Sequence, residues 1–375
     1  MIKWIEITNF KSIQADKIFL PQMGAIVGNN SAGKTNLLQA VGLIKRLATG
    51  ENIKIAARGY VLSPDELFNI NVPSREFHIK ISLSDNEEQE YLLEVSFFNT
   101  EDPKLPVTIQ NEKLLKSTSD RETFELVYER KNNNLENKNR VNIPLSIDTD
   151  KLALSLYKNP DAQAVRSIFS KVHLPDMEFK SLRESLTTPT DDNLARFLVQ
   201  LKTEQEESYK IFQTIIKKLL PSFSNIIEVL PKALRASDER KMYLVLLEEK
   251  NLKTALSMQT VSLGDLRTLF ILTVTLLAKE HSTIFFEEIE NALHPKRVKD
   301  VIEFLENIAR KKDIQLLYTT HSPTVINRLR PSEILFTRKD ENKGTKYILL
   351  DNPRNISAIE SILNSGGEIT EFIYS

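Results

Sequence analysis

Cysteine is absent from this sequence of 375 residues. Its absence excludes disulfide frameworks, thiolate nucleophiles and cysteine-based zinc sites. Glycine is also scarce, with 10 residues, so glycines that gather in one stretch are expected to serve the backbone geometry there. Three of them, Gly24, Gly28 and Gly33, fall within one short segment.

The sequence also has no excess of positive or of negative charge. The 50 Lys and Arg residues balance 51 Asp and Glu residues, so the net charge neither supports nor excludes a polyanionic partner, and any nucleic-acid surface must be local. No long apolar stretch follows the first residues, so we expect no secretory signal and no membrane anchor, and a cytoplasmic protein. With 41% hydrophobic and 27% charged residues, the chain has the composition of an ordinary globular protein.

Apolar residues in the first part of the chain predict strands around one helix. Short apolar runs within residues 1–27 predict strands, and the last of them leads directly into Gly28. Over residues 34–47 apolar side chains recur every three or four positions, which predicts an amphipathic helix. Residues 77–81 and 91–97 predict a β-hairpin.

The middle of the chain is less regular. The Asn-rich residues 131–139 predict a surface loop. The apolar spacing over residues 191–220 predicts a long helix with room for one break, ending before Pro221.

Strands alternate with helices in the C-terminal third. Residues 284–286 and 314–318 are apolar runs that predict buried strands. Residues 266–278 predict a buried helix, and residues 295–311 predict a second helix between the two strands. This alternation predicts parallel crossover units with both faces of the sheet covered.

Residues 28–35 read GNNSAGKT and fit the phosphate-binding pattern G-x-x-x-x-G-K-[ST], with a predicted strand before them and a predicted helix after them. Such a loop turns backbone N–H groups toward an anion, and the helix N-terminus adds a partial positive charge. Lys34 is expected to reach the terminal phosphates and Thr35 to be a ligand of Mg²⁺. An incidental glycine turn is the alternative, which the strand–helix context disfavours. The predicted nucleoside triphosphate site comprises Asn29, Asn30, Ser31, Ala32, Gly33, Lys34, Thr35 and Asn36.

Two acidic residues follow the first buried strand of the C-terminal third. Glu287 and Glu288 stand at a strand end, where open sheets bind ligands. We assign Glu287 to the Mg²⁺ ion and Glu288 to the attacking water, because consecutive residues point to opposite faces of a strand. His321 follows the next buried strand and is expected to donate to a γ-phosphate oxygen or to the attacking water. The alternatives are a solvated strand end for the acids and a structural role for His321; for His294, a turn role and a nucleotide role both stay open.

Three further segments carry a family resemblance. Residues 5–13 read IEITNFKSI, residues 261–265 read VSLGD and residues 287–295 read EEIENALHP. In this order, and together with the phosphate-binding loop and His321, they resemble the ABC-class ATPase heads of the SMC/RecF type. The resemblance is closest to the ATPase half of OLD-family (overcoming lysogenisation defect) proteins and related bacterial antiphage-defence ATPases. The segments correspond to the first strand and turn, the signature loop, and the Walker B motif with the D-loop, and His321 corresponds to the switch histidine.

The resemblance spans residues 1 to about 330 and implies a fold. The implied fold is α/β, a P-loop NTPase of the ABC-ATPase type with a mixed sheet flanked by helices and a helical lobe inserted in the middle. Residues 1–100 would form an N-terminal ATPase lobe, residues 101–250 an inserted helical or variable lobe, and residues 251–375 a C-terminal ATPase lobe.

The signature segment, residues 261–265, is the part of the resemblance that implies an oligomeric state. Ser262 and Gly264 precede an apolar helix, an arrangement that makes a second anion-binding helix terminus. In the family this terminus completes the site of the partner subunit. The resemblance therefore implies a homodimer with ATP sandwiched between two heads, in which Ser262 and Gly264 touch the γ-phosphate. It also implies that Lys11 lies near the nucleotide.

The sequence departs from the family pattern at three points. Glu287 replaces the usual aspartate of the Walker B motif, which allows slow hydrolysis. No Q-loop glutamine can be assigned. OLD proteins continue into a TOPRIM nuclease after the switch histidine, whereas residues 322–375 here offer only two short strands, at 333–337 and 347–350, and no room for its carboxylate cluster.

The pattern predicts an ATP-driven dimerising switch that senses or clamps DNA or a foreign protein and controls a separate effector, such as a TOPRIM nuclease or another toxin. The alternative is a RecF-like DNA-repair or recombination ATPase that clamps DNA. A transporter subunit is disfavoured by the segments that resemble the soluble group. A nuclease is disfavoured because no second metal-binding acid cluster is evident.

Overall fold

The computed structural model describes the chain except for residues 70, 73, 101, 103, 119–122, 133, 140, 144–146, 176–193, 233–241, 251, 253, 341–343, 366 and 375. The chain divides into two compact units. The first comprises Met1–Leu174, His281–Glu287 and Leu317–Ser375, and the second comprises Pro175–Glu280 and Glu288–Leu316. This division does not follow the three segments predicted from the sequence.

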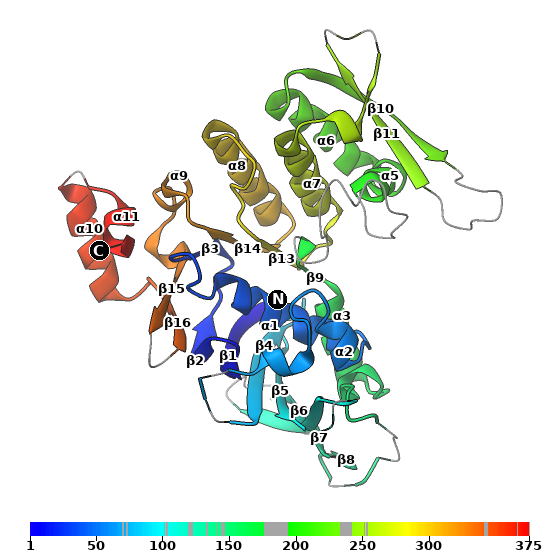
Figure 1. Cartoon of the computed structure of the whole chain (residues 1–375), viewed down its shortest axis with the longest axis vertical. Coiled ribbons are helices and arrows are strands. Elements are labelled where there is room, and N and C mark those ends of the chain that lie inside the picture. The colour runs from blue at the N-terminus through cyan, green and yellow to red at the C-terminus, as the bar shows by residue number, and fades with distance from the viewer. Residues whose placement is uncertain are drawn as a thin grey trace. The chain divides into compact units, whose positions relative to one another are not determined.

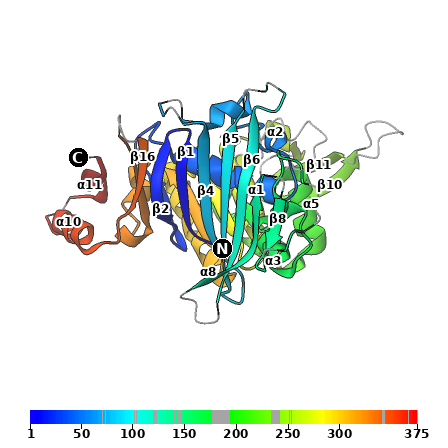
Figure 2. The ribbon, with the colours of Figure 1, turned by 90° about the horizontal axis from the view of Figure 1, so that it is seen from below.

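One large sheet organises the first unit (Figure 1). Thirteen described strands lie in the order β8-β7-β6-β5-β4-β1-β2-β16-β15-β3-β14-β13-β9. Figure 2 shows β2, β1, β4, β5 and β6 side by side. The strands are β1 (Ile2–Phe10), β2 (Ile13–Phe19), β3 (Met23–Val27), β4 (Glu76–Ser84), β5 (Glu90–Asn99), β6 (Val107–Ser117), β7 (Phe124–Lys131), β8 (Asn134–Asn137), β9 (Val172–His173), β13 (Thr283–Phe286), β14 (Gln315–Thr320), β15 (Ile334–Asp340) and β16 (Gly344–Leu349).

The sheet is mixed, as the sequence predicts. From β8 through β4 and β1 to β2 each neighbouring pair is antiparallel, whereas β15 runs parallel to β3 and β13 runs parallel to β9. The antiparallel part follows the alternation of side chains, because Ile5, Ile7 and Ile81 are fully buried, while residues between them reach the other face.

Helix α1 of the first unit follows the predicted apolar spacing. The buried side chains of α1 include Leu37, Leu38, Val41 and Ile44, which form one face of the helix. The helices are α1 (Lys34–Ala48), α2 (Ile53–Ala56), α3 (Pro160–Ser170), α9 (Pro323–Ile326), α10 (Pro353–Asn364) and α11 (Ile369–Tyr374), with short 3₁₀ turns η1 (Pro64–Leu67), η2 (Ala153–Ser155) and η5 (Pro331–Glu333).

The second unit combines four helices with a small antiparallel sheet, among its described residues. The predicted long helix is present as α5 (Leu194–Glu204) and α6 (Glu206–Leu219), with one break at Gln205; its predicted first residues, 191–193, lie outside the described residues. The other elements are α7 (Leu263–Leu277), α8 (Pro295–Lys311), β10 (Phe223–Lys232), β11 (Met242–Glu249), β12 (Leu256–Ser257) and the 3₁₀ turn η4 (Met258–Thr260).

Residues 131–139 lie largely at the surface, as predicted, but the prediction that they form a loop without a strand is wrong. Lys131 pairs with Asn134, and β7 and β8 form an antiparallel hairpin across these residues. Leu135 is fully buried, and this one apolar anchor holds a strand whose other residues are polar. Strands β6 to β8 also extend the main sheet into the segment predicted to be an inserted helical or variable lobe.

A buried ion pair lies in this extension. Glu112 in β6 and Arg130 in β7 are fully buried, and Arg130 Nη1 lies 4.0 Å from Glu112 Oε2. The Tyr128 hydroxyl and the backbone N–H groups of Ala153 and Leu154 donate to the Glu112 carboxylate at 2.5, 2.6 and 2.7 Å. The Arg130 guanidinium donates to the carbonyl oxygens of Asn132, Lys151 and Asp148. Burial raises the pKa of Glu112, and these donors oppose that rise. The pair thus fastens the segment around residues 148–154 to the sheet.

Candidate phosphate-binding site

The phosphate-binding loop stands between β3 and α1, as predicted. Ser31 and Gly33 have positive φ angles of 63° and 102°, a backbone conformation that glycine adopts without strain. The Ala32 N–H donates to the Asn29 carbonyl at 3.1 Å and closes the turn. The loop then leads into the N-terminus of α1, whose first N–H groups have no partner within the helix. The backbone therefore has the form of an anion-binding loop.

Lys34 lies within this loop. Only 8% of the residue is exposed, and its Nζ donates to the Gly28 carbonyl at 2.7 Å and to the Asn29 carbonyl at 3.0 Å. The ammonium group is thus held beside the loop backbone, where it would meet a bound phosphate.

Thr35 and Glu287 are brought together from positions far apart in the sequence. The Thr35 hydroxyl donates a hydrogen bond to Glu287 Oε1. A hydroxyl and a carboxylate oxygen are ligands that Mg²⁺ accepts beside water and phosphate oxygens. The two side chains therefore fit a magnesium ion, and the assignment of Glu287 to that ion stays a prediction.

Two strands near the C-terminus hold the loop, a role that sequence reasoning missed. The Tyr347 hydroxyl in β16 donates to the Gly33 carbonyl at 2.7 Å, and the Thr337 hydroxyl in β15 donates to the Ala32 carbonyl at 2.8 Å. A Cβ atom on Gly33 would lie 2.7 Å from the Thr345 side chain. The sequence predicts both strands, and hydroxyl side chains on their buried face were the available signal.

Replacing Tyr347 with phenylalanine is expected to weaken ATP binding about tenfold, because the Gly33 carbonyl would lose its buried donor. Burial strongly raises the pKa of Tyr347, so the hydroxyl keeps its proton at all ordinary pH values. Equilibrium dialysis with labelled ATP measures the change. Tyr91→Phe is the matched control, since the Tyr91 hydroxyl lies 3.5 Å from Asp161 and away from the loop; equal effects of the two variants would contradict the prediction.

Lys11 and Asn36 connect the β1–β2 turn to α1. The Lys11 Nζ donates to Gln39 Oε1 at 2.5 Å and to the Tyr60 carbonyl at 3.1 Å, and burial lowers the pKa of Lys11. The Asn36 side chain donates to the Ser12 hydroxyl at 2.8 Å. These contacts are structural, and a role of Lys11 at the nucleotide remains a prediction.

The two predicted catalytic residues belong to different units. His321 is exposed and directly follows β14, which lies between β3 and β13 in the sheet. Glu288 is the first residue of the second segment of the second unit and has a positive φ of 45°, an unusual backbone conformation for a glutamate. Their roles stay predictions.

The second unit contains the signature segment. Ser262 caps α7, and its hydroxyl accepts a hydrogen bond from the Asp265 N–H at 3.1 Å. A Cβ atom on Gly264 would lie 2.5 Å from the Ala292 carbonyl, so glycine is required where the first turn of α7 meets Ala292. His294 caps α8 through Nδ1, which accepts from the Lys296 N–H at 3.3 Å. This contact favours the turn role for His294.

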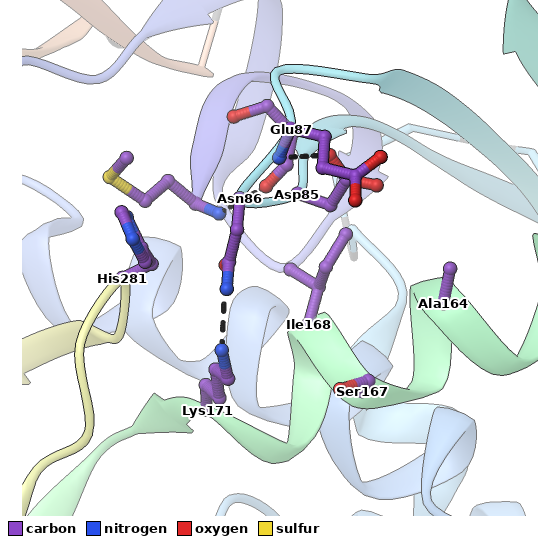
Figure 3. Close-up of a pocket in the computed structure, with 10 residues that line it drawn as sticks. Asp85, Asn86, Glu87, Ala164, Ser167, Ile168, Lys171 and His281 are labelled. Atoms are coloured by element: carbon purple, nitrogen blue, oxygen red, sulfur yellow. Dashed lines mark hydrogen bonds between the residues drawn. The ribbon is translucent and has the colours of Figure 1, made fainter.

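A pocket in the first unit lies away from these residues. It has a volume of about 210 Å³ and is lined by the β4–β5 turn, by α3 and by His281 (Figure 3). The pocket also borders Met1, which precedes β1. The other end of β1 leads to Ser12, which accepts a hydrogen bond from Asn36 next to the phosphate-binding loop. The pocket and the loop therefore lie toward opposite ends of this strand. None of the predicted site residues lines this pocket.

The described residues also bear on two other kinds of function. No group of three or more His, Asp or Glu side chains among them could hold a metal ion. Within the same part of the chain, no helix is both long and apolar enough to span a membrane.

Comparisons with known proteins agree with the geometry. The fold resembles the SMC head bound to the C-winged helix domain of ScpA, with 14% identity, a TM-score of 0.58 and coverage of 95% of this chain and 99% of that chain. It also resembles an Smc head domain with an extended coiled coil bound to the C-terminal domain of ScpA, derived from Pyrococcus furiosus, with 14% identity, a TM-score of 0.51 and coverage of 96% and 99%. These likenesses confirm the predicted ABC-type P-loop fold.

No curated protein sequence matches the chain. A family profile matches residues 25–327, from the strand before the phosphate-binding loop to beyond His321. The chain has the fold of an ABC-type ATPase and belongs to the family described as "AAA domain, putative AbiEii toxin, Type IV TA system".

Proposed function

We propose that this protein binds and hydrolyses ATP and acts as a nucleotide-dependent dimerising switch. The observation that carries the proposal is the convergence of Thr35 and Glu287 beside a complete phosphate-binding loop. The Thr35 hydroxyl and the Glu287 carboxylate are hydrogen-bonded at the end of the loop although they lie far apart in the chain. A glycine turn with only a structural role would need neither the hydroxyl nor the carboxylate.

Each residue has a distinct part in the proposed reaction. The loop N–H groups and Lys34 bind the β- and γ-phosphates, and Thr35 with Glu287 would hold Mg²⁺, which would neutralise phosphate charge. Glu288 orients and deprotonates the attacking water, and His321 donates to a γ-phosphate oxygen. The longer Glu287 side chain is consistent with slow turnover.

The dimer would be completed by the signature segment. Ser262 is exposed at the N-terminus of α7, where backbone N–H groups and the helix dipole favour an anion. We infer that this helix start contacts the γ-phosphate of ATP bound to a second copy of the chain. Two such contacts would make the association of the heads depend on ATP.

The proposed role is the control of a separate effector in bacterial antiphage defence, in the manner of OLD-related ATPases. The family description supports it, because that description names a putative toxin of a type IV toxin–antitoxin system. In this proposal the effector is another protein, such as a TOPRIM nuclease or another toxin.

Glu288→Gln tests the dimerising switch. Without the carboxylate, the hydrolysis rate is expected to fall about 100-fold or more, so the ATP-bound state should accumulate and the mass in solution should double when ATP and Mg²⁺ are added. Light scattering after size-exclusion chromatography measures the mass, with Glu303→Gln on α8 as a matched control. An unchanged mass with saturating ATP would refute the proposal, whereas steeply salt-dependent duplex DNA binding with ATP would favour a RecF-like clamp.

A further inference from the structure

Arg297 connects the start of α8 to the signature segment within the second unit. Its Nη1 lies 2.5 Å from Asp265 Oδ1. The other oxygen, Asp265 Oδ2, accepts a hydrogen bond from the Ser262 hydroxyl at 2.6 Å. One carboxylate therefore joins the guanidinium of α8 to the serine that caps α7.

The geometry around this link is tight. The Asp265 side chain is 17% exposed and the Arg297 side chain 28% exposed. Arg297 Nη1 also lies 3.7 Å from where a Cβ atom on Gly264 would stand, and the Ala292 carbonyl lies closer still. The first turn of α7 thus packs against both the D-loop and the first turn of α8, and the arginine has little freedom to leave the aspartate.

Asp265 creates an electrostatic conflict for an anion at this helix start. A carboxylate in the first turn suits the positive end of the helix dipole by itself, but it repels a phosphate brought to the same N–H groups. The Asp265 carboxylate also accepts the hydrogen bond that the Ser262 hydroxyl would otherwise donate to a phosphate oxygen. Pairing with the Arg297 guanidinium neutralises the Asp265 carboxylate and weakens the hydrogen bond that this carboxylate accepts from Ser262.

We propose that Arg297 is a positioning residue for the γ-phosphate contact made by the signature segment. By neutralising Asp265 it leaves Ser262 and the N-terminus of α7 receptive to the ATP held by a second copy. The inference rests on the proposed function, since it concerns the ATP-dependent dimer. It assigns to Arg297 a part in ATP-dependent dimerisation that the motifs of the resemblance do not include.

The test is a double-mutant cycle in the Glu288→Gln background, with ATP-dependent mass as the readout. Arg297→Ala is expected to raise the ATP concentration for half-maximal dimerisation about tenfold, while Arg297→Lys restores most of the loss. Adding Arg297→Ala to Asp265→Asn should have little further effect, because the repelling charge is then gone. The defect of Arg297→Ala should also shrink in high salt, which screens charge repulsion.

Two controls and a fallback comparison separate the possible explanations. Arg310→Ala removes an arginine from the other end of α8, where it pairs with Glu306, and should leave dimerisation unchanged. ATP binding at protein concentrations too low for dimers should be unaffected by Arg297→Ala, because the phosphate-binding loop is intact. If Arg297→Ala fails to fold, Arg297→Lys and the double variant with Asp265→Asn carry the same comparison.

The outcomes are decisive in either direction. Equal losses for Arg297→Ala in the presence and absence of Asp265→Asn, or no loss at all, would overturn the role of Arg297 while leaving the dimerising switch intact. If the Glu288→Gln parent itself shows no ATP-dependent dimer, the proposed function fails and this inference falls with it.

Discussion

Replacing Lys34 with alanine is expected to weaken ATP binding about 100-fold and to abolish ATP-dependent dimerisation. The ammonium lies beside the carbonyls of Gly28 and Asn29, within the loop that would receive the phosphates. Alanine removes a charged donor, and hydrogen bonds to charged groups contribute about 1.5–3 kcal/mol each, with tenfold in affinity for every 1.4 kcal/mol. Isothermal titration with ATP and Mg²⁺ measures the loss.

Lys45→Ala provides the comparison for this variant. Lys45 lies in the last turn of the same helix, α1, so the substitution removes the same charge from the same element without touching the loop. We expect its ATP affinity to match that of the unchanged protein. Similar affinities for the two alanine variants would show that the loop does not bind triphosphate.

Replacing Arg130 with alanine is expected to destabilise the first unit by about 3–5 kcal/mol, the range measured when one partner of a buried ion pair is removed. The reason is that the Glu112 carboxylate would stay fully buried without its counter-charge. Three carbonyl oxygens around residues 132–151 would also lose their donor. Chemical denaturation followed by the fluorescence of Trp4, the sole tryptophan, reports on this unit.

Lys80→Ala is the control for the buried pair. Lys80 pairs with Glu94 at 2.8 Å on strands β4 and β5 of the same sheet, with each side chain about one third exposed. Exposed pairs contribute at most about 1 kcal/mol. An unfolding free energy for Arg130→Ala no lower than that for Lys80→Ala would contradict the assigned role of the cluster.

Local patterns predicted most of the fold around the site. Apolar runs placed the strands before Gly28 and before Glu287, and the spacing of apolar side chains placed α1 and α8, because strand and helix periods are visible over short windows. The same reasoning failed at residues 131–139, where a polar composition concealed a strand. A single buried leucine and the backbone bonds of a neighbouring strand decide that segment, and neither is a property of composition.

The candidate site was predicted in part. The phosphate-binding loop is contiguous, so its residues could be read from one motif. Thr35 and Glu287 were each assigned to Mg²⁺ from the sequence, and the structure joins the two side chains by a hydrogen bond. The hydrogen bonds from the Thr337 and Tyr347 hydroxyls to the loop carbonyls were not predicted. The order of residues does not show which strand will lie beside β3.

The sequence by itself determined the kind of phosphate site and the elements that present it, since a glycine loop, a lysine and a helix start act over a few consecutive residues. Only the tertiary structure decided which distant groups support that site. Strand order brought the two C-terminal strands to the loop, and helix packing brought Arg297 to Asp265. Such contacts depend on the burial of whole elements, which is a property of the folded chain and not of any short stretch of it.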